Sequence, residues 1–272
     1  MAAWAAAGGK KESEGPLASD FDFLTQDAGF CEQGCENWEQ AESLLQRRAA
    51  ELCLRKADLP RTGVDITFAG DLQAQCTASN YTMRELGIPF AGVYGACSTM
   101  AETLGLAAVF AAGGMAERVL ALTSSHFCAA ERQFRTPLEY GAKRTPTAQW
   151  TATAAGACLV RAHGSAGVPV LSVTFGRVQD FAVHDINNMG AAMMPAASRC
   201  ISRFGCGVCR ACGQDTVRRR AESAVSRLLR RVSPSPASAL RSRYLIIPII
   251  PSISCSAALR SARSLRRATP CG

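Results

Sequence analysis

The stretch Phe90-Ala-Gly-Val-Tyr-Gly-Ala-Cys97 joins a short apolar segment to a glycine turn, and an Ala- and Leu-rich segment follows it. Pro89 ends the preceding helix and Gly95 opens a sharp turn, which predicts a strand over 90–94 and a helix over 97–112. In open α/β sheets, ligands bind beyond the carboxyl ends of the strands, beside helix N-termini. The sequence therefore predicts a ligand site around Cys97.

The segments on either side of this turn alternate between helical and strand patterns. Apolar residues recur at three- and four-residue spacings over 37–57, which predicts an amphipathic helix with Asn37 as its N-cap. Short apolar segments bounded by turn residues predict strands. The order of the elements predicts an α/β layered domain with short connections. The remaining predictions are a helix over 72–86, strands over 64–69, 118–123, 147–160 and 168–178, and a long loop over 124–146.

Positive charge is concentrated at the C-terminal end of the chain. The 272 residues include 30 basic and 22 acidic side chains, which gives a net charge of +8. Residues 199–272 contain 15 arginines and no lysine, opposed only by Asp215 and Glu222. The preceding part of the chain is therefore mildly acidic, which argues against specific nucleic-acid binding. Nonspecific electrostatic binding would follow from the composition of the tail alone.

Residues 199–272 also differ in composition from the rest of the chain. Arginine without lysine, mixed with Ser, Pro, Cys and Ala, is what a GC-rich coding sequence gives when it is read out of frame. We therefore expect a tail that is disordered or out of frame. Cys206, Cys209 and Cys212 have the spacing of an iron–sulfur motif, but its fourth cysteine and following proline are missing. We predict a coincidence of composition there, no metal site and no cofactor.

Hydropathy and cysteine usage limit the class of protein further. A content of 48% hydrophobic residues is enough for a buried core. The apolar stretch 105–122 is interrupted by Glu117 and Arg118 and falls short of the roughly 20 residues that a membrane-spanning helix needs. The first 15 residues lack the pattern of a secretory signal peptide. Thirteen cysteines, an odd number without a repeating spacing, favour reduced thiols.

Three side chains near the predicted site carry reactive or charged groups, and each allows two interpretations. Cys97 is either a thiolate stabilised by the helix dipole and free N–H groups or a small buried hydrophobe. His126 follows the next strand and is either a base or hydrogen-bond donor in the same pocket or a packed histidine bonded to the backbone. Arg132 either holds a carboxylate-bearing ligand or belongs to a solvated loop.

Several motifs together resemble the stage V sporulation protein AD family, whose members have a thiolase-like fold. The resemblance covers residues 15–197 and implies that 15–198 is the N-terminal half of a thiolase-like α/β/α layered domain. Only the first of the fold's two similar halves is recognisable, followed by the tail at 199–272. Residues 1–14 diverge and stand in place of the family's opening segment, which contains its first strand. The motifs are Phe68-Ala-Gly-Asp-Leu72, Leu86-Gly-Ile-Pro-Phe90, Tyr94-Gly-Ala-Cys-Ser-Thr-Met100, Thr123-Ser-Ser-His-Phe-Cys128, Ala130-Glu-Arg-Gln-Phe-Arg135, Pro137-Leu-Glu-Tyr-Gly141, Pro146-Thr-Ala-Gln-Trp150 and Asp185-Ile-Asn-Asn-Met-Gly-Ala-Ala192.

The resemblance implies a sporulation protein that binds dipicolinic acid or its calcium chelate and supports its uptake into the forespore. It implies a peripheral position on the cytoplasmic side of the forespore inner membrane, with the membrane proteins of the stage V sporulation A complex as partners. Analogy with thiolase-like domains adds a homodimer. The expected ligand-binding residues are Cys97, His126, Arg132, Gln149 and Asn188.

Two alternatives to a binding protein stay open. One is a thiolase-like acyltransferase that uses Cys97 as its nucleophile and acyl carrier. The other is a truncated, non-functional product, since half of a thiolase-like fold would leave one face of its sheet and helices without a partner layer. Such a product would melt without a cooperative transition.

Overall fold

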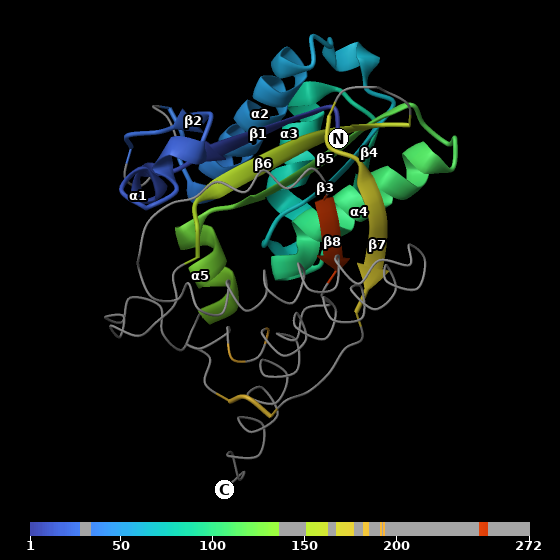
Figure 1. The fold of residues 1–272 in the computed structure, drawn as a ribbon. Helices are drawn as coiled ribbons and strands as arrows, with labels where there is room; N and C mark the ends of the chain where they lie inside the picture. Colours follow the sequence, from blue (N-terminus) through green and yellow to red (C-terminus); the bar gives the residue numbers. More distant parts are fainter. Residues whose placement is uncertain are drawn as a thin grey trace, which may run out of the picture. The chain divides into compact units, whose positions relative to one another are not determined.

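The computed structural model describes residues 1–27, 34–135, 151–162, 167–176, 182–184, 191, 193 and 245–249. The chain divides into two compact units, Met1–Val170 and Leu171–Gly272. The first unit contains a six-stranded sheet with helices on both faces (Figure 1). Strands β7 (Val170–Phe175) and β8 (Leu245–Ile249) form a separate two-stranded sheet.

The six-stranded sheet has the order β2-β1-β6-β5-β3-β4. Strand β6 runs antiparallel to its neighbours β1 and β5, whereas β3 is parallel to both β4 and β5. The carboxyl ends of β3, β4 and β5 therefore lie at one edge of the sheet. The strands are β1 (Ala3–Gly8), β2 (Phe23–Leu24), β3 (Ile66–Gly70), β4 (Phe90–Gly92), β5 (Arg118–Ser125) and β6 (Ala154–Arg161).

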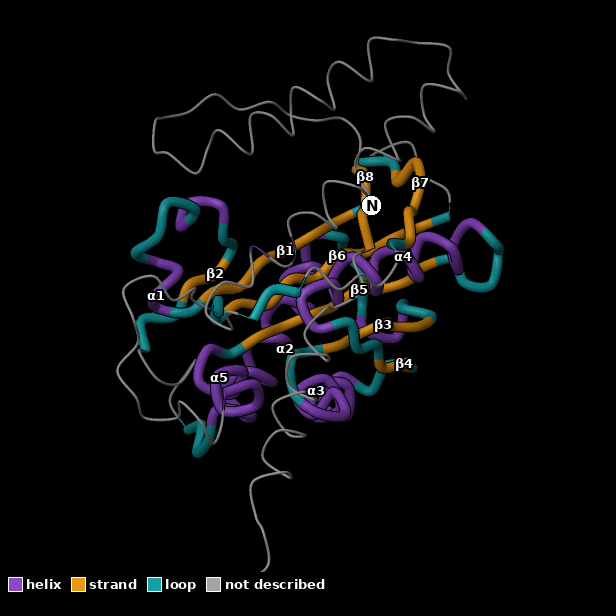
Figure 2. Tube along the Cα trace, turned by 90° about the horizontal axis from the view of Figure 1, so that it is seen from below, coloured by secondary structure: helices purple, strands orange, loops and turns teal. Residues whose placement is uncertain are grey.

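Helices cover the two faces of this sheet and make the layered arrangement. Figures 1 and 2 show α2 on one side of the sheet and α4 on the other. Leu120 and Leu122 of β5 belong to the buried core that includes α2, whereas Val119 and Ala121 alternate with them along the strand. The helices are α1 (Lys10–Ser13), α2 (Trp38–Lys56), α3 (Thr77–Leu86), α4 (Thr99–Ala112) and α5 (Phe127–Arg135).

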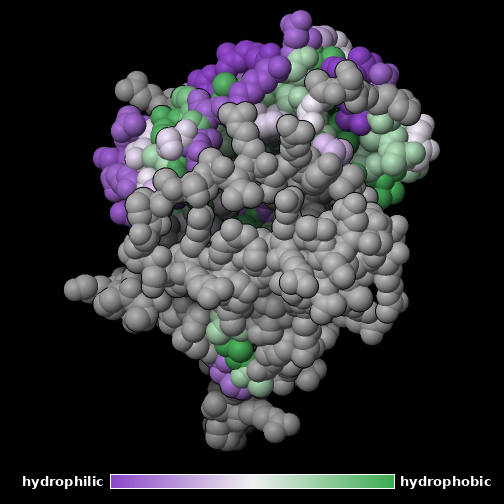
Figure 3. Space-filling view, in the orientation of Figure 1, coloured by the Kyte–Doolittle hydropathy of each residue, from purple (hydrophilic) through white to green (hydrophobic). Residues whose placement is uncertain are grey.

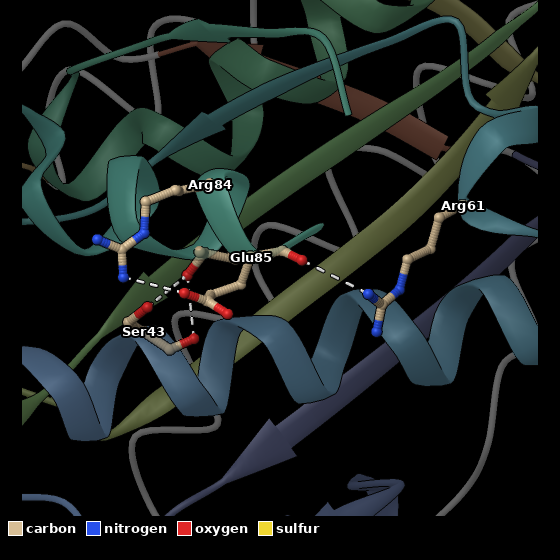
Figure 4. A network of polar contacts seen from close by, with 5 residues as sticks. Ser43, Arg61, Arg84 and Glu85 are labelled. Carbon is tan, nitrogen blue, oxygen red and sulfur yellow. Dashed lines mark hydrogen bonds and ion pairs between the residues drawn. The ribbon is translucent and has the colours of Figure 1, made fainter. Parts of the chain in front are cut away.

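Polar contacts join α3 to α2 and to the segment between α2 and β3. The hydroxyl groups of Ser43 and Thr82 lie 3.0 Å apart, and Arg84 pairs with Glu85 at 2.9 Å. The guanidinium group of Arg61 donates to the carbonyl oxygen of Glu85 at 3.5 Å (Figure 4). Thr82 is fully buried, whereas the two arginines and Glu85 are exposed, so these contacts run from the interior of the unit to its surface.

Helix α4 is apolar around most of its circumference. Val109 on this helix is 48% exposed, and Met115, just beyond the C-terminal end of the helix, is 60% exposed. Figure 3 shows hydrophobic surface at this end of the unit, whereas hydrophilic residues predominate over α1 and α2. Among the described residues, no helix has both the length and the apolar character needed to cross a membrane.

Residues 1–14 differ from the prediction, because they supply a strand of the sheet. Strand β1 pairs with β6 over six residues and with β2 on its other side. Ala3, Ala5 and Ala7 are buried against the core while Trp4 between them is 51% exposed. The sequence predicts a divergent segment without a strand here, because alanine has little strand preference of its own. In the structure, the small size of alanine lets α2 pack closely against β1.

The other predicted helices and strands form with shifted bounds, of which three differences are the largest, whereas α1, β2 and β8 were not predicted. The helix predicted over 37–57 is confirmed as α2, and the side chain of Asn37 accepts a hydrogen bond from the backbone N–H of Gln40 at 2.9 Å. The predicted loop over 124–146 is wrong at its start, because α5 forms there. Strand β6 begins at Ala154 rather than at 147.

The third difference lies before α3, which begins five residues later than predicted. Gln75 and Cys76 both have positive φ angles, 61° and 53°, which a continuous helix does not allow. The side-chain amide of Asn80 donates to the carbonyl oxygens of both residues, at 2.9 and 2.8 Å. This clamp holds a left-handed turn between β3 and α3 that the apolar spacing does not reveal.

Candidate functional site

The carboxyl edge of β3, β4 and β5 brings together the turns that carry the candidate residues. Asp71 follows β3, Cys97 follows β4 and His126 follows β5. Because β3 pairs with both of the other strands, Asp71 lies between the turns of Cys97 and His126. The turns that carry these three residues therefore lie side by side at one edge of the sheet.

The turn that carries Cys97 is a short 3₁₀ segment, Ala96–Ser98, that leads into α4. Ala96 has a φ angle of 49°, in the left-handed region. The N–H of Gly95 donates to the hydroxyl oxygen of Thr99 at 3.1 Å, and the Ser98 hydroxyl donates to the carbonyl oxygen of Gly95 at 2.9 Å. Side chains of the turn itself therefore fix its backbone.

Cys97 lies at the surface, but its thiol is not set up as a thiolate. The residue as a whole is exposed. Neighbouring atoms nevertheless bury part of its sulfur, and this burial raises the pKa of the Cys97 thiol above its ordinary value. The thiol is therefore protonated near neutral pH. Of the two interpretations from sequence, neither the small buried hydrophobe nor the stabilised thiolate describes it.

His126 is buried at the start of α5. Only 3% of its surface is exposed, and its carbonyl oxygen accepts a hydrogen bond from the N–H of Ala130 at 2.9 Å. Its backbone N–H donates to the carboxylate of Glu42. The neighbouring Ser124 is also buried, and its hydroxyl donates to the same carboxylate at 2.9 Å. The backbone at His126 is thus tied to α2.

Glu42 is a fully buried acidic residue of α2 that the sequence reasoning missed. Besides Ser124 and His126, the side-chain amide of Gln73 donates to its carboxylate, at 2.6 Å. Burial, together with the negative charge of Asp71, raises the pKa of Glu42 to about 7. The signal in the sequence was a carboxylate next to Ala41 on the apolar side of a helix, where charged residues are rare unless they are paired.

Asp71 is the second fully buried carboxyl group at this edge. It accepts hydrogen bonds from the backbone N–H groups of Gln73 and Ser79, at 2.9 and 2.8 Å, and from the Ser79 hydroxyl at 2.7 Å. Burial raises the pKa of its carboxyl group. The side-chain amide of Gln46 donates to the Ser79 hydroxyl oxygen at 3.0 Å and extends the network into α2.

Arg132 lies on α5 and contacts the beginning of α2. Its guanidinium group forms an ion pair with Glu39 and lies 5.3 Å from the ring centroid of Trp38. The ion pair and the cation–π contact together restrict the orientation of the Arg132 side chain. Gln149 and Asn188, the other two predicted ligand-binding residues, lie outside the described residues.

Within the described ranges, no group of three or more His, Cys, Asp or Glu side chains is arranged to hold a metal ion. The cysteine motif of the tail, Cys206 to Cys212, lies outside those ranges. The described edge therefore offers hydrogen-bonding groups, a neutral thiol and a buried imidazole.

Comparison with known proteins identifies related sequences. A family model described as Stage V sporulation protein AD matches residues 1–206. The Stage V sporulation protein AD of Bacillus subtilis (strain 168) is 43% identical over 197 residues, which cover 72% of this chain and 57% of that protein. The chain thus spans little more than half the length of this relative. The family match begins at residue 1, ahead of the predicted start at 15.

Comparison with solved structures identifies the fold. The 3-oxoacyl-[acyl-carrier-protein] synthase III from Aquifex aeolicus VF5 superposes with a TM-score of 0.52 at 14% sequence identity, covering 98% of this chain and 91% of that one. An identity this low shows the fold alone. The predicted thiolase-like layered α/β/α fold is therefore confirmed.

Proposed function

The chain belongs to the stage V sporulation protein AD family, and from this premise we propose that it binds dipicolinic acid, or its calcium chelate, and supports uptake of this ligand into the forespore. The observation that carries the proposal is the family match over residues 1–206, together with 43% identity to the Bacillus subtilis protein. The matched region contains every described residue of the carboxyl edge of β3, β4 and β5.

The ligand would lie at that edge, near Cys97 and His126. Dipicolinate carries two carboxylates, which are best held by several hydrogen-bond donors at once. The protonated Cys97 thiol and the imidazole of His126 would supply such donors, and Arg132, which pairs with Glu39, would be the cation on the neighbouring helix. Gln149 and Asn188 stay predicted contacts of the same ligand.

Partners and location follow from the same premise. We propose that the protein acts at the cytoplasmic side of the forespore inner membrane, as a peripheral component that works with the membrane proteins of the stage V sporulation A complex. A homodimer is proposed by analogy with other thiolase-like domains.

His126 provides a direct test of ligand binding. Calorimetry with dipicolinate should show binding to the 272-residue chain, and His126→Ala should weaken it about tenfold because a donor to a carboxylate is lost. His184→Ala is the matched control, since His184 is an exposed histidine, and it should bind like the parent. Thermal melting of each variant checks that it is folded. Absence of heat with the parent chain would refute the proposal.

Acyl transfer is the second candidate function, favoured by the exposed position of Cys97 at the start of α4. In that reaction the Cys97 sulfur attacks the thioester carbonyl carbon, a new thioester forms, and coenzyme A leaves as the protonated thiol. Because the raised pKa keeps the Cys97 thiol protonated, we expect no adduct after incubation with acetyl-CoA at pH 7. Intact-mass measurement checks this. An acetyl adduct that disappears in Cys97→Ser would instead support the acyltransferase.

A further inference from the structure

The carboxyl group of Glu42 connects two turns that flank the proposed ligand site. Its three hydrogen-bond donors come from Gln73 after β3, from Ser124 at the end of β5 and from the backbone of His126. Glu42 itself belongs to α2, so one side chain ties a helix to both turns. Movement of any of the three partners would be transmitted to the backbone at His126.

The charge of this group is poorly compensated. The titratable group whose charge acts on Glu42 is Asp71, from the turn after β3, whereas the turn after β5 contributes the backbone N–H of His126. In the part of the chain that the structure describes, no lysine or arginine forms an ion pair with Glu42 or Asp71. The nearest cation from α5, Arg132, pairs with Glu39 one turn earlier on α2. Neutral donors alone therefore stabilise the ionised carboxyl group.

The two protonation states of Glu42 are both accessible near neutral pH. Burial and the negative charge of Asp71 raise its pKa to about 7, whereas its hydrogen bonds with Gln73, Ser124 and His126 lower the pKa. Between pH 6 and 8 the group therefore changes from mostly neutral to mostly ionised. The carboxylic acids of dipicolinate are fully ionised over the same range.

We propose that Glu42 is a positioning residue of the dipicolinate site and that its protonation regulates ligand affinity. Neutral Glu42 holds the His126 turn without placing a negative charge behind it. Ionised Glu42 adds a buried negative charge one hydrogen bond away from the turn that meets a dianionic ligand, and the repulsion weakens binding. Linkage makes the effect reciprocal, so ligand binding draws a proton onto Glu42 near neutral pH. This inference rests on the proposed function.

The test measures dipicolinate affinity by calorimetry between pH 6 and 8. The parent chain should lose about fivefold in affinity over this range, the lower end of the usual range for coupling between two sites. Glu42→Gln keeps the shape of the side chain and removes its charge. This variant should bind dipicolinate like the parent at pH 6, and its affinity should fall much less than that of the parent between pH 6 and 8. Glu51→Gln is the matched control on α2, where Glu51 pairs with Arg61 at the surface, and it should follow the parent profile.

A second variant, Ser124→Ala, should shift the pH range of the decline in affinity rather than abolish the decline. Ser124→Ala deletes one hydrogen bond to the ionised carboxylate, so it should raise the pKa of Glu42 and shift the decline in affinity to higher pH. A residue that only stabilised the fold would change the affinity without shifting its pH profile. Calorimetry in buffers of different ionisation enthalpy should also show proton uptake on binding that Glu42→Gln abolishes.

Thermal unfolding gives a readout that needs no ligand. The pKa of Glu42 in the folded chain, about 7, is above its ordinary value of 4.5, so folding favours the protonated form. The stability from this preference is complete below the unfolded pKa and is lost as pH rises through 7. The melting temperature of the parent should therefore fall relative to Glu42→Gln between pH 5 and 8.

The possible failures can be distinguished. No dipicolinate binding by the parent at any pH overturns the proposed function, and the regulation with it. Binding whose pH profile is the same in the parent, Glu42→Gln and Ser124→Ala overturns the regulation alone. A difference in melting temperature between the parent and Glu42→Gln that stays constant from pH 5 to 8 overturns the titration of Glu42 on which the regulation depends.

Discussion

Gly70→Ala is expected to lower the free energy of unfolding by about 3 kcal/mol, at the upper end of the usual cost of overpacking. A Cβ atom at this position would lie 1.9 Å from the carbonyl oxygen of Val93 and 2.6 Å from the Cγ2 atom of Thr99. The first conflict is with backbone, which cannot turn aside as a flexible side chain can. The end of β3 would therefore separate from the turn that leads from β4 to α4.

Gly156→Ala is the matched control for this substitution. Gly156 lies in β6, where an added Cβ would meet nothing closer than the Sδ atom of Met100 at 4.0 Å. Its stability should change by no more than about 1 kcal/mol. Urea denaturation followed by circular dichroism measures both variants. Equal stability of the two variants would show that the close approach of β3 to the Cys97 turn does not exist in solution.

Leu120→Ala is the second substitution with a large expected effect, a loss of about 3 kcal/mol in the free energy of unfolding. Leu120 is fully buried in the middle of β5, within the core that α2 covers. Because β5 pairs with both β3 and β6, its neighbours cannot move in to fill the space that the missing methyl groups leave.

The control for Leu120→Ala is the same change at an exposed position. Leu17 is 63% exposed, so Leu17→Ala should change stability by less than about 0.5 kcal/mol. The midpoint and slope of urea denaturation measure both variants. Similar midpoints would contradict the assignment of Leu120 to the core.

The elements that the sequence predicted well are those whose own residues determine their structure. The apolar spacing and Asn37 cap define α2, and its observed bounds differ from the predicted ones by one residue at each end. The buried segment of β5 is apolar and bounded by polar residues, so local pattern and burial agree. The position of Cys97 at a strand-to-helix turn was predicted for the same reason.

The elements that the sequence did not predict depend on distant partners. Strand β1 consists mainly of alanines, and its strand conformation comes from pairing with β6 and β2. The left-handed turn at Gln75 and Cys76 depends on the Asn80 clamp. The burial of Glu42 depends on donors supplied from residues 73, 124 and 126, which no local pattern brings together.

The pairing of β1 also affects the order in which the molecule can fold. Strand β1 lies between β2 and β6, and its six-residue pairing with β6 joins Ala3 to Leu159 and Gly8 to Ala154. During synthesis, the first strand must therefore wait for about 150 further residues before its longer ladder can form. Pairing over such a separation slows folding, because the chain loses conformational entropy when the loop closes, before the new contacts compensate for that loss. The backbone of β1 is exposed meanwhile, so the nascent chain passes through a stage in which this strand can pair with other molecules.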